Sequence, residues 1–330
     1  MTAICLSFLM VWCLCPETAE PAEQTGPFQG EKRGFDCMPA RIEILIPEAS
    51  GSEDSPKVLA DLAEAVIRKA DALFSPFGES SDVRRLNSAR SGEWVRVDPL
   101  TVILVREALK WHRITGGRFD PTIGPLKKLF KFERNRLNTW PTEAEISAAR
   151  KKVGAEKLRL DVEGNRLSFA VDGMALDLGA IAKGFAADLA AEALQARGVG
   201  NALINCGGEM RILGRNPGPP PGPWKVALVT PGGGESRYLA EIENRGVASS
   251  GNYESYFEYE GKRYSHIINP LTGMPLEDQV AGVTVVHPGH ATVADAVSTV
   301  FSILGPDEAE RFLRDRGREE FPEGLEVVLF

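Results

Sequence analysis

Two oxygen-bearing side chains, Asp295 and Thr299, lie four residues apart in an otherwise apolar stretch of the sequence. A four-residue spacing places both on one face of a helix, with Ser298 next to them. The apolar neighbours indicate burial, where an uncompensated carboxylate would be costly. Because Mg²⁺ prefers carboxylate and hydroxyl oxygens, the pattern predicts a magnesium site, although a carboxylate that only accepts hydrogen bonds at a helix start also fits.

The segment Leu176–Asp188 (LDLGAIAKGFAAD) has the features of an anion-binding helix start. Asp177 stands at a strand end, and a glycine turn leads into a helix predicted from about Ala180 to Arg197. Free amides at a helix start attract phosphate, the small Ala180 leaves its carbonyl open to a metal ion, and Lys183 follows one turn later. The segment is neither a Walker loop nor GxGxxG, so a capped surface helix remains the alternative.

The segment Thr115–Leu126 (TGGRFDPTIGPL) holds an aromatic ring and a carboxylate, Phe119 and Asp120, in a turn bounded by Gly and Pro. This pair suits a flat heterocycle with a polar edge, while an ordinary turn after a helix is the alternative. We expect Phe119, like Asp177, to contact the ligand and not to lie in the core.

Two further segments join predicted strands. Asn205–Glu209 (NCGGE) has consecutive glycines, which allow a ligand to approach the backbone closely, although a simple hairpin explains them nearly as well. Ser249–Gly273 contains a Tyr-rich hairpin and then His266, which is a candidate acid/base group or oxyanion partner. A structural histidine is the alternative.

The flanking sequence predicts the elements that position these residues. Helices are expected from Ser55-Pro56, from Asp98-Pro99 to Gly116-Gly117, after the capping box of Thr142 and Glu145, and from Ala291 to Leu304, where Gly305 and Pro306 stop it. Strands are expected at Ala40–Ile46, around the turn 163–165, and from Asn201 to Val229. Strands mixed with separate helices, without regular alternation, favour an α+β fold over a doubly wound sheet.

The composition of the 330-residue chain is globular, with 43% apolar and 25% charged residues and a formal charge of −8. The acidic balance argues against a nucleic-acid partner. Residues 1–15 include the apolar run Ile4–Cys15, which is too short to span a bilayer and resembles a secretory signal. Residues 16–34 are expected to form a flexible tether, and residues 35–330 the folded domain. Outside the presumed signal, only Cys37 and Cys206 remain, which predicts neither a disulfide framework nor a zinc site.

In this order the segments resemble those of the FAD:protein FMN transferase family, the ApbE-like flavin transferases, from about Met38 to Gly305. The resemblance implies a T-fold-related α+β fold of mixed, largely antiparallel sheets with packed helices. It also implies FAD contacts from Met38, Phe77, Arg118, Phe119, Asp120, Asp177, Lys183 and Ile268, and a Mg²⁺ site at the Ala180 carbonyl, Asp295 and Thr299, with Ser298 adjacent. The chain has Phe77 where many members have Tyr, and Asn269 where Asp is frequent.

The resemblance implies Mg²⁺-dependent transfer of the FMN half of FAD to a threonine of an exported or membrane redox-complex subunit, with release of AMP. We assign catalytic roles to His266, Asp177 and Lys183. The acceptor should carry a motif rich in small residues that ends in Thr. The alternatives are a Mg²⁺-dependent FAD pyrophosphatase that gives FMN and AMP, and a noncatalytic periplasmic flavin-binding protein.

The expected location is the periplasmic side of the bacterial cytoplasmic membrane, with attachment through the N-terminus as one option. Leu14 stands where a lipoprotein signal has a small residue. The sequence therefore leaves lipidation and signal cleavage open, together with the acceptor's identity and the oligomeric state.

Overall fold

The computed structural model describes residues 11–12, 28–130, 139–229, 237–251, 256–277 and 282–329. Its largest sheet has eight strands in the order β1-β16-β15-β11-β8-β7-β3-β2. The bounds are Val11–Trp12 for β1, Gly30–Cys37 for β2, Ala40–Pro47 for β3, Ala202–Cys206 for β7, Glu209–Leu213 for β8, Gly246–Gly251 for β11, Gly282–His287 for β15 and Glu326–Leu329 for β16. Neighbouring strands are antiparallel, except that β1 pairs with β16 in parallel.

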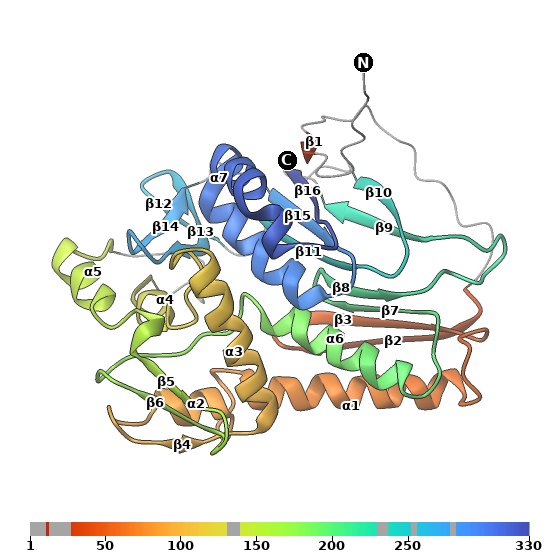
Figure 1. Cartoon of the computed structure of the whole chain (residues 1–330), viewed down its shortest axis with the longest axis horizontal. Helices are drawn as coiled ribbons and strands as arrows, with labels where there is room; N and C mark the ends of the chain where they lie inside the picture. The colour runs from red at the N-terminus through yellow and green to blue at the C-terminus, as the bar shows by residue number, and fades with distance from the viewer. Residues whose placement is uncertain are drawn as a thin grey trace.

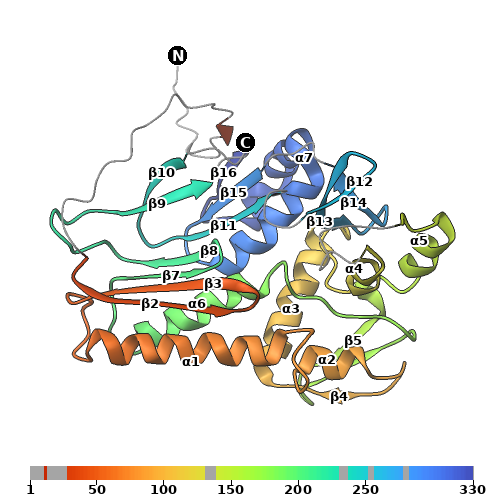
Figure 2. The same cartoon turned by 180° about the vertical axis from the view of Figure 1, so that it is seen from behind.

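Three helices contact this sheet: α1 (Pro56–Phe74), α6 (Ala182–Gln195) and α7 (Ala291–Glu320). Helices α6 and α7 lie in front of the sheet in Figure 1 and behind it in Figure 2, and α1 runs along the β2–β3 edge. Ile42, Ile44 and Ile46 alternate along β3 and point into the core shared with α1 and α6. On the opposite face, a hairpin of β9 (Trp224–Val229) and β10 (Arg237–Ile242) buries Trp224 against the sheet.

The remaining elements lie to one side of the sheet (Figure 1). They are α2 (Asp82–Asn87), α3 (Pro99–Ile114), α4 (Gly124–Phe130), α5 (Glu143–Arg150), a 3₁₀ turn (Ala155–Lys157), the sheet of β4 (Val95–Arg96), β5 (Leu158–Asp161) and β6 (Arg166–Phe169), and the sheet of β12 (Tyr256–Tyr259), β13 (Lys262–Asn269) and β14 (Met274–Glu277). One hydrophobic cluster joins Leu104 and Trp111 of α3 to Val297 and Phe301 of α7. The two parts therefore share a core.

The predicted α+β class and several helix starts are confirmed. Asp98 caps α3, with its side chain accepting from the Leu100 amide at 2.9 Å. Thr142 and Glu145 form both hydrogen bonds of the predicted capping box. The described cysteines Cys37 and Cys206 are buried and form no disulfide.

The predicted stop at Gly305 is confirmed, because Gly305 leaves helical geometry (φ 70°) and interrupts α7 after Leu304. Pro306 then begins a second helical segment, which the sequence did not predict and which runs to Glu320. One predicted boundary is wrong: the folded chain starts before Phe35, since β2 begins at Gly30 and pairs along its whole length with β3. The predicted signal lies outside the described residues apart from β1. Within the described part of the chain, no helix is long and apolar enough to cross a membrane.

Candidate active site

Two adjoining cavities lie where the two parts of the fold meet. The smaller has a volume of about 500 Å³ and the larger about 880 Å³. The residues that line both are Met38, Pro39, Lys127, Asp177, Gly179, Lys183 and His266. Together the cavities form a continuous site of a size suited to an extended ligand.

The structure brings most of the predicted site residues together. The smaller cavity is lined by Met38, Arg118, Phe119, Asp120, Asp177, Ala180, Lys183, His266, Ile268, Asp295 and Thr299. Phe77 lines only the larger cavity, where its side chain is 60% exposed. Ser298 lines neither cavity.

In each of the helices α6 and α7, an aspartate accepts hydrogen bonds from backbone amides in the first turn of the other helix. Asp295 of α7 is 3% exposed, and its Oδ2 accepts from the Gly184 amide in the first turn of α6 at 2.9 Å. In return, Asp188 of α6 accepts from the Ala291 and Thr292 amides at the start of α7, at 3.0 and 2.9 Å. A Cβ at Gly184 would lie 2.4 Å from the Ala291 carbonyl oxygen, so only glycine allows this approach. The exchange fixes Asp295 beside the start of α6.

The oxygen groups next to Asp295 come from one face of α7 and from β11. Thr299, one turn after Asp295, has its Oγ1 3.5 Å from Ser250 Oγ. Ser298 instead donates to the Asp295 carbonyl oxygen at 2.9 Å and lies 2.7 Å from Ser250 Oγ. One residue along a helix is a rotation of about 100°, so Ser298 does not share the cavity-facing side of Asp295 and Thr299. Ser298 is linked to the cavity through Ser250, which lines it, and its predicted place next to a metal stays a prediction.

The donors around Asp295 fit a hard cation. A carboxylate, a hydroxyl and the Ala180 backbone line the same cavity, and all offer oxygen. Among the described residues, no three His, Cys, Asp or Glu side chains converge as a metal cluster. A cation here would therefore use one carboxylate with neutral oxygens.

Asp177 is held in place from three directions. Asn87 bonds both the amide and the carbonyl of Leu176, at 2.7 and 2.9 Å. The Asp177 carboxylate accepts from Lys127 Nζ at 2.9 Å and from the Gly179 amide at 3.0 Å. Burial favours the neutral acid, but the Lys127 ammonium, these hydrogen bonds and His266 outweigh it, so the pKa of Asp177 lies below its usual value.

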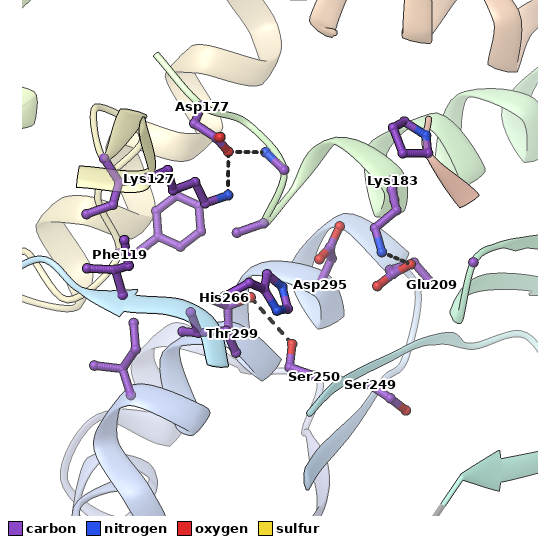
Figure 3. Close-up of a pocket in the computed structure, with 18 of the residues that line it drawn as sticks. Phe119, Lys127, Asp177, Lys183, Glu209, Ser249, Ser250, His266, Asp295 and Thr299 are labelled. Carbon is purple, nitrogen blue, oxygen red and sulfur yellow. Dashed lines mark hydrogen bonds and ion pairs between the residues drawn. The ribbon is translucent and has the colours of Figure 1, made fainter. Parts of the chain in front are cut away.

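A second lysine–carboxylate pair faces this one across the cavity (Figure 3). Lys183 Nζ lies 2.8 Å from Glu209 Oε2. Glu209 is 3% exposed and follows Gly207 and Gly208, whose φ values of 76° and 107° form the tight turn between β7 and β8. A Cβ at Gly207 would lie 2.6 Å from the Ala40 Cβ, so this turn packs directly against the β2–β3 turn.

The sequence did not assign Lys127 or Glu209 to the site. Glu209 stands in the NCGGE segment, which already indicated close approach to a ligand. Lys127 directly follows TGGRFDPTIGPL, but its partner Asp177 is 50 residues away. Only the fold brings each lysine to its carboxylate.

Phe119 and Asp120 serve the fold as well as the cavity. Phe119 is 4% exposed and belongs to the main hydrophobic cluster, so the expectation that it lies outside the core is wrong. Asp120 accepts from the Thr122 and Ala155 amides at 2.8 and 3.1 Å. Arg118 contacts Glu308 of α7 at 3.2 Å. These contacts make the loop rigid where it meets the ligand space.

His266 lies on β13, between the two lysine pairs in Figure 3, and Thr299 and Asp295 lie beside it. Ile268 follows on the same strand, with its side chain buried at the cavity wall. Ile267 lines the same cavity, and the pairing of β13 with β14 shifts register between Tyr264 and Ile268, so the strand is irregular where it meets the site.

An extended cleft with paired lysines, an imidazole and a corner of oxygen donors has the size and the groups to hold an elongated ligand that carries phosphate. The chain belongs to the ApbE family, which it matches over residues 38–321. It is 33% identical over 308 residues to a Vibrio cholerae protein named FAD:protein FMN transferase, covering 92% of this chain and 87% of that one. It is also 33% identical to the Haemophilus influenzae protein of the same name, covering 74% of this chain and 72% of the other.

Solved structures agree with this assignment. The fold is similar to the ApbE protein of Thermotoga maritima, with a TM-score of 0.79, 29% identity and coverage of 91% of this chain and 94% of the other. It is similar to the flavin transferase ApbE of Vibrio cholerae, with a TM-score of 0.78, 29% identity and coverage of 92% and 94%. The predicted family and fold are thereby confirmed.

Proposed function

We propose that this chain transfers the FMN half of FAD to a threonine hydroxyl of an acceptor protein, with AMP as leaving group and Mg²⁺ as cofactor. FMN transfer from FAD to protein is the activity named for its curated relatives, and the chain belongs to their family. The magnesium ion, the threonine and the roles of individual residues are proposed from the site.

One observation carries the proposal. Asp295, Thr299 and Ala180 line the same cavity as Lys183 and His266, two residues that also line the larger cavity. An oxygen corner for a cation thus stands next to groups that can hold phosphate and accept a proton.

The chemistry is a phosphoryl-type substitution at the phosphorus of the FMN half. The threonine oxygen forms a bond to this phosphorus, the bond to the AMP oxygen breaks, and AMP leaves with that oxygen. Such reactions depend mainly on positioning and charge neutralisation. A bound Mg²⁺ would supply charge neutralisation at the diphosphate, held by the Asp295 carboxylate, the Thr299 hydroxyl and the Ala180 carbonyl.

Residues of the chain itself bind the diphosphate, accept the proton and contact the rings of the ligand. Lys183 and Lys127 place ammonium groups at the junction of the cavities, where the diphosphate of a ligand spanning both would lie. His266 accepts the proton of the incoming hydroxyl. Phe119, Ile268 and Met38 supply apolar walls for the ligand's rings.

We also propose a location and an acceptor class. The apolar run Ile4–Cys15 supports export to the periplasmic side of the cytoplasmic membrane. The family resemblance supports an exported or membrane redox-complex subunit as acceptor. Cell fractionation of the full chain, with and without residues 1–15, tests this: equal recovery of both forms in the cytoplasm contradicts export.

The central experiment replaces Asp295 with Asn. Loss of one charged ligand should weaken Mg²⁺ binding and reduce transfer to background, while FAD still binds through its rings. Mass spectrometry would measure covalent FMN on a synthetic peptide with small residues and one Thr, across a Mg²⁺ titration. A peptide with Ala in place of that Thr reports hydrolysis, because FMN and AMP then appear without a covalent product.

The matched control is Asp307→Asn, an exposed carboxylate on the same helix, which should behave as wild type. Thermal unfolding of each variant excludes misfolding. A folded Asp295→Asn protein with wild-type rate and wild-type magnesium dependence would refute the proposed site.

A further inference from the structure

The smaller cavity has no surplus of positive charge. Its lining contains four basic side chains, Arg41, Arg118, Lys127 and Lys183, and four acidic ones, Asp120, Asp177, Glu209 and Asp295. The two arginines also have carboxylates near them from outside the lining, Asp36 at 3.4 Å and Glu308 at 3.2 Å. The larger cavity differs, because it is lined by four basic side chains, Arg84, Lys127, Lys128 and Lys183, and only two acidic ones, Asp71 and Asp177.

Glu209 is the acidic residue that the reaction does not explain. It lines the smaller cavity but not the larger one, and its carboxylate lies 2.8 Å from the Lys183 ammonium. Burial of this carboxylate is costly, and its pairing with Lys183 only partly offsets that cost. A polar residue that merely oriented Lys183 would not need a charge.

Glu209 and Asp295 both lie close to Lys183, because Glu209 contacts its ammonium at 2.8 Å and Asp295 accepts from the amide of the next residue, Gly184, at 2.9 Å. Burial raises the pKa of the Cys206 thiol, Glu209 and Asp295 raise it further, and Lys183 lowers it. All three charges therefore act on the same buried point at the end of β7. Glu209, Lys183 and Asp295 form one electrostatic group, which we call the acidic corner, with a net charge of minus one.

We propose that Glu209 makes tight binding of FAD conditional on Mg²⁺, an inference that rests on the proposed Mg²⁺ site at Asp295. The acidic corner repels a diphosphate, because its single ammonium is already neutralised and Asp295 adds a negative charge. A divalent cation reverses the sign of the corner, so the diphosphate is then attracted. Binding energies of FAD and Mg²⁺ are therefore coupled, and each ligand strengthens the other by the same factor.

The coupling depends on the charge of the acidic corner, which gives a series of variants with a predicted order. Glu209→Gln makes the corner neutral, Lys183→Met makes it more negative, and the double variant restores the wild-type sum. Glu43→Gln is the control, since Glu43 is an exposed carboxylate on neighbouring β3. Flavin fluorescence would give the Kd for FAD in EDTA and in saturating Mg²⁺, without any acceptor.

The wild type should bind FAD about tenfold more tightly with Mg²⁺ than without it. Glu209→Gln should bind FAD more tightly than wild type in EDTA. The factor by which Mg²⁺ increases its FAD affinity should be about fivefold smaller than in wild type. Mg²⁺ should increase the FAD affinity of Lys183→Met most. In the double variant, Mg²⁺ should increase FAD affinity by the same factor as in wild type, although the affinity is lower with and without Mg²⁺. Glu43→Gln should match wild type.

Two results would overturn the inference. One is an equal increase in FAD affinity on adding Mg²⁺ in wild type and in Glu209→Gln. The other is loss of FAD binding in a Glu209→Gln protein that unfolds at the wild-type temperature, because Glu209 would then only position Lys183. If the single variant is unstable because the ammonium lacks its partner, the double variant still tests the charge order against Lys183→Met. If Mg²⁺ changes neither FAD affinity nor transfer in wild type, the proposed Mg²⁺ site itself fails. If transfer requires Mg²⁺ and Asp295, but the effect of Mg²⁺ on FAD affinity is the same with and without the Glu209 carboxylate, only this inference fails.

Discussion

At the scale of single residues, each lysine at the junction of the cavities is paired with a carboxylate, Lys127 with Asp177 and Lys183 with Glu209. Such pairs keep a long side chain in one position before the ligand arrives, which lowers the entropy lost on binding. The low pKa of Asp177 keeps its carboxylate charged through the neutral range, so the Lys127 pair persists there. His266, the residue proposed as proton acceptor, lies between the two pairs in Figure 3.

The first prediction concerns His266→Asn. Asparagine keeps a polar side chain on β13 but cannot accept a proton, so the single-turnover transfer rate should fall by about a hundredfold or more while FAD affinity stays within about twofold. Rapid-quench measurement of covalent FMN, across pH, would test both the size of the loss and the disappearance of the acidic limb of the pH profile, where the rate rises as the base loses its proton.

His290→Asn is the control, because His290 lines neither cavity. A normal single-turnover rate for the His266 variant would return that residue to a structural role.

Residue spacing predicted part of this site and could not predict the rest. Asp295 and Thr299 share a helix face by their four-residue spacing, and the structure places both in one cavity. Ser298 shows the limit of that reasoning, since being adjacent in sequence turns a helical side chain away from its neighbour. Lys127 and Glu209 were missed because a pair between distant segments leaves no local pattern.

At the scale of elements, the starts of α6 and α7 are one structural unit. Each helix supplies an aspartate to the other's first turn, and Gly184 lets the two backbones touch. Helix starts were predicted well because caps are local, as at Asp98 and Thr142. Gly305 interrupts α7 where a stop was predicted, but the second segment was missed, because Pro306 was interpreted only as part of the stop although Pro also begins helices.

The second prediction concerns His287, the last residue of β15, just before the turn that leads into α7. This side chain is 7% exposed, and its Nδ1 accepts from the Gly289 and His290 amides at 3.1 and 2.9 Å. Burial first, then the charges of His290 and Arg211, lower the pKa of His287 to about 4. The folded state therefore binds this proton less well than the unfolded state, whose pKa is about 6.5.

Stability should consequently fall as pH drops from about 6.5 toward 4, by up to about 1.4 kcal/mol per pH unit from this residue. His287→Asn can accept the same two amides without titrating, so its unfolding free energy should be flatter in that window. Urea unfolding at several pH values would measure both proteins. Because Asp188 titrates near the same helix start, the difference between wild type and variant is the relevant quantity, and parallel curves would contradict the assignment.

At the scale of the whole molecule, the site lies where the helix-covered sheet meets the part built from α2 to α5. The smaller cavity takes residues from β13, α6 and α7, and the larger takes Phe74 at the end of α1 and Phe77 just after it. Fold class was predictable from the mixture of strands and helices, but the meeting of these parts was not, because it depends on contacts such as Asn87 with Leu176, 89 residues apart. A ligand that spans both cavities should hold the parts together.

The last prediction uses Phe77 to test whether the ligand occupies both cavities. FAD binds only the folded state, so at a free concentration of about 100 times Kd it should add about 2.7 kcal/mol to the unfolding free energy. Phe77 is 60% exposed and lines only the larger cavity, so Phe77→Ala should leave the ligand-free melting temperature unchanged but reduce the shift caused by FAD and Mg²⁺. Trp94→Ala is the matched control, because Trp94 is 41% exposed and lines neither cavity.

FMN or AMP alone should give smaller shifts of the melting temperature than FAD, since each fills only part of the site. If Phe77→Ala keeps the full FAD shift, or if AMP alone reproduces it, the ligand does not extend through the larger cavity in the way the joined lining implies.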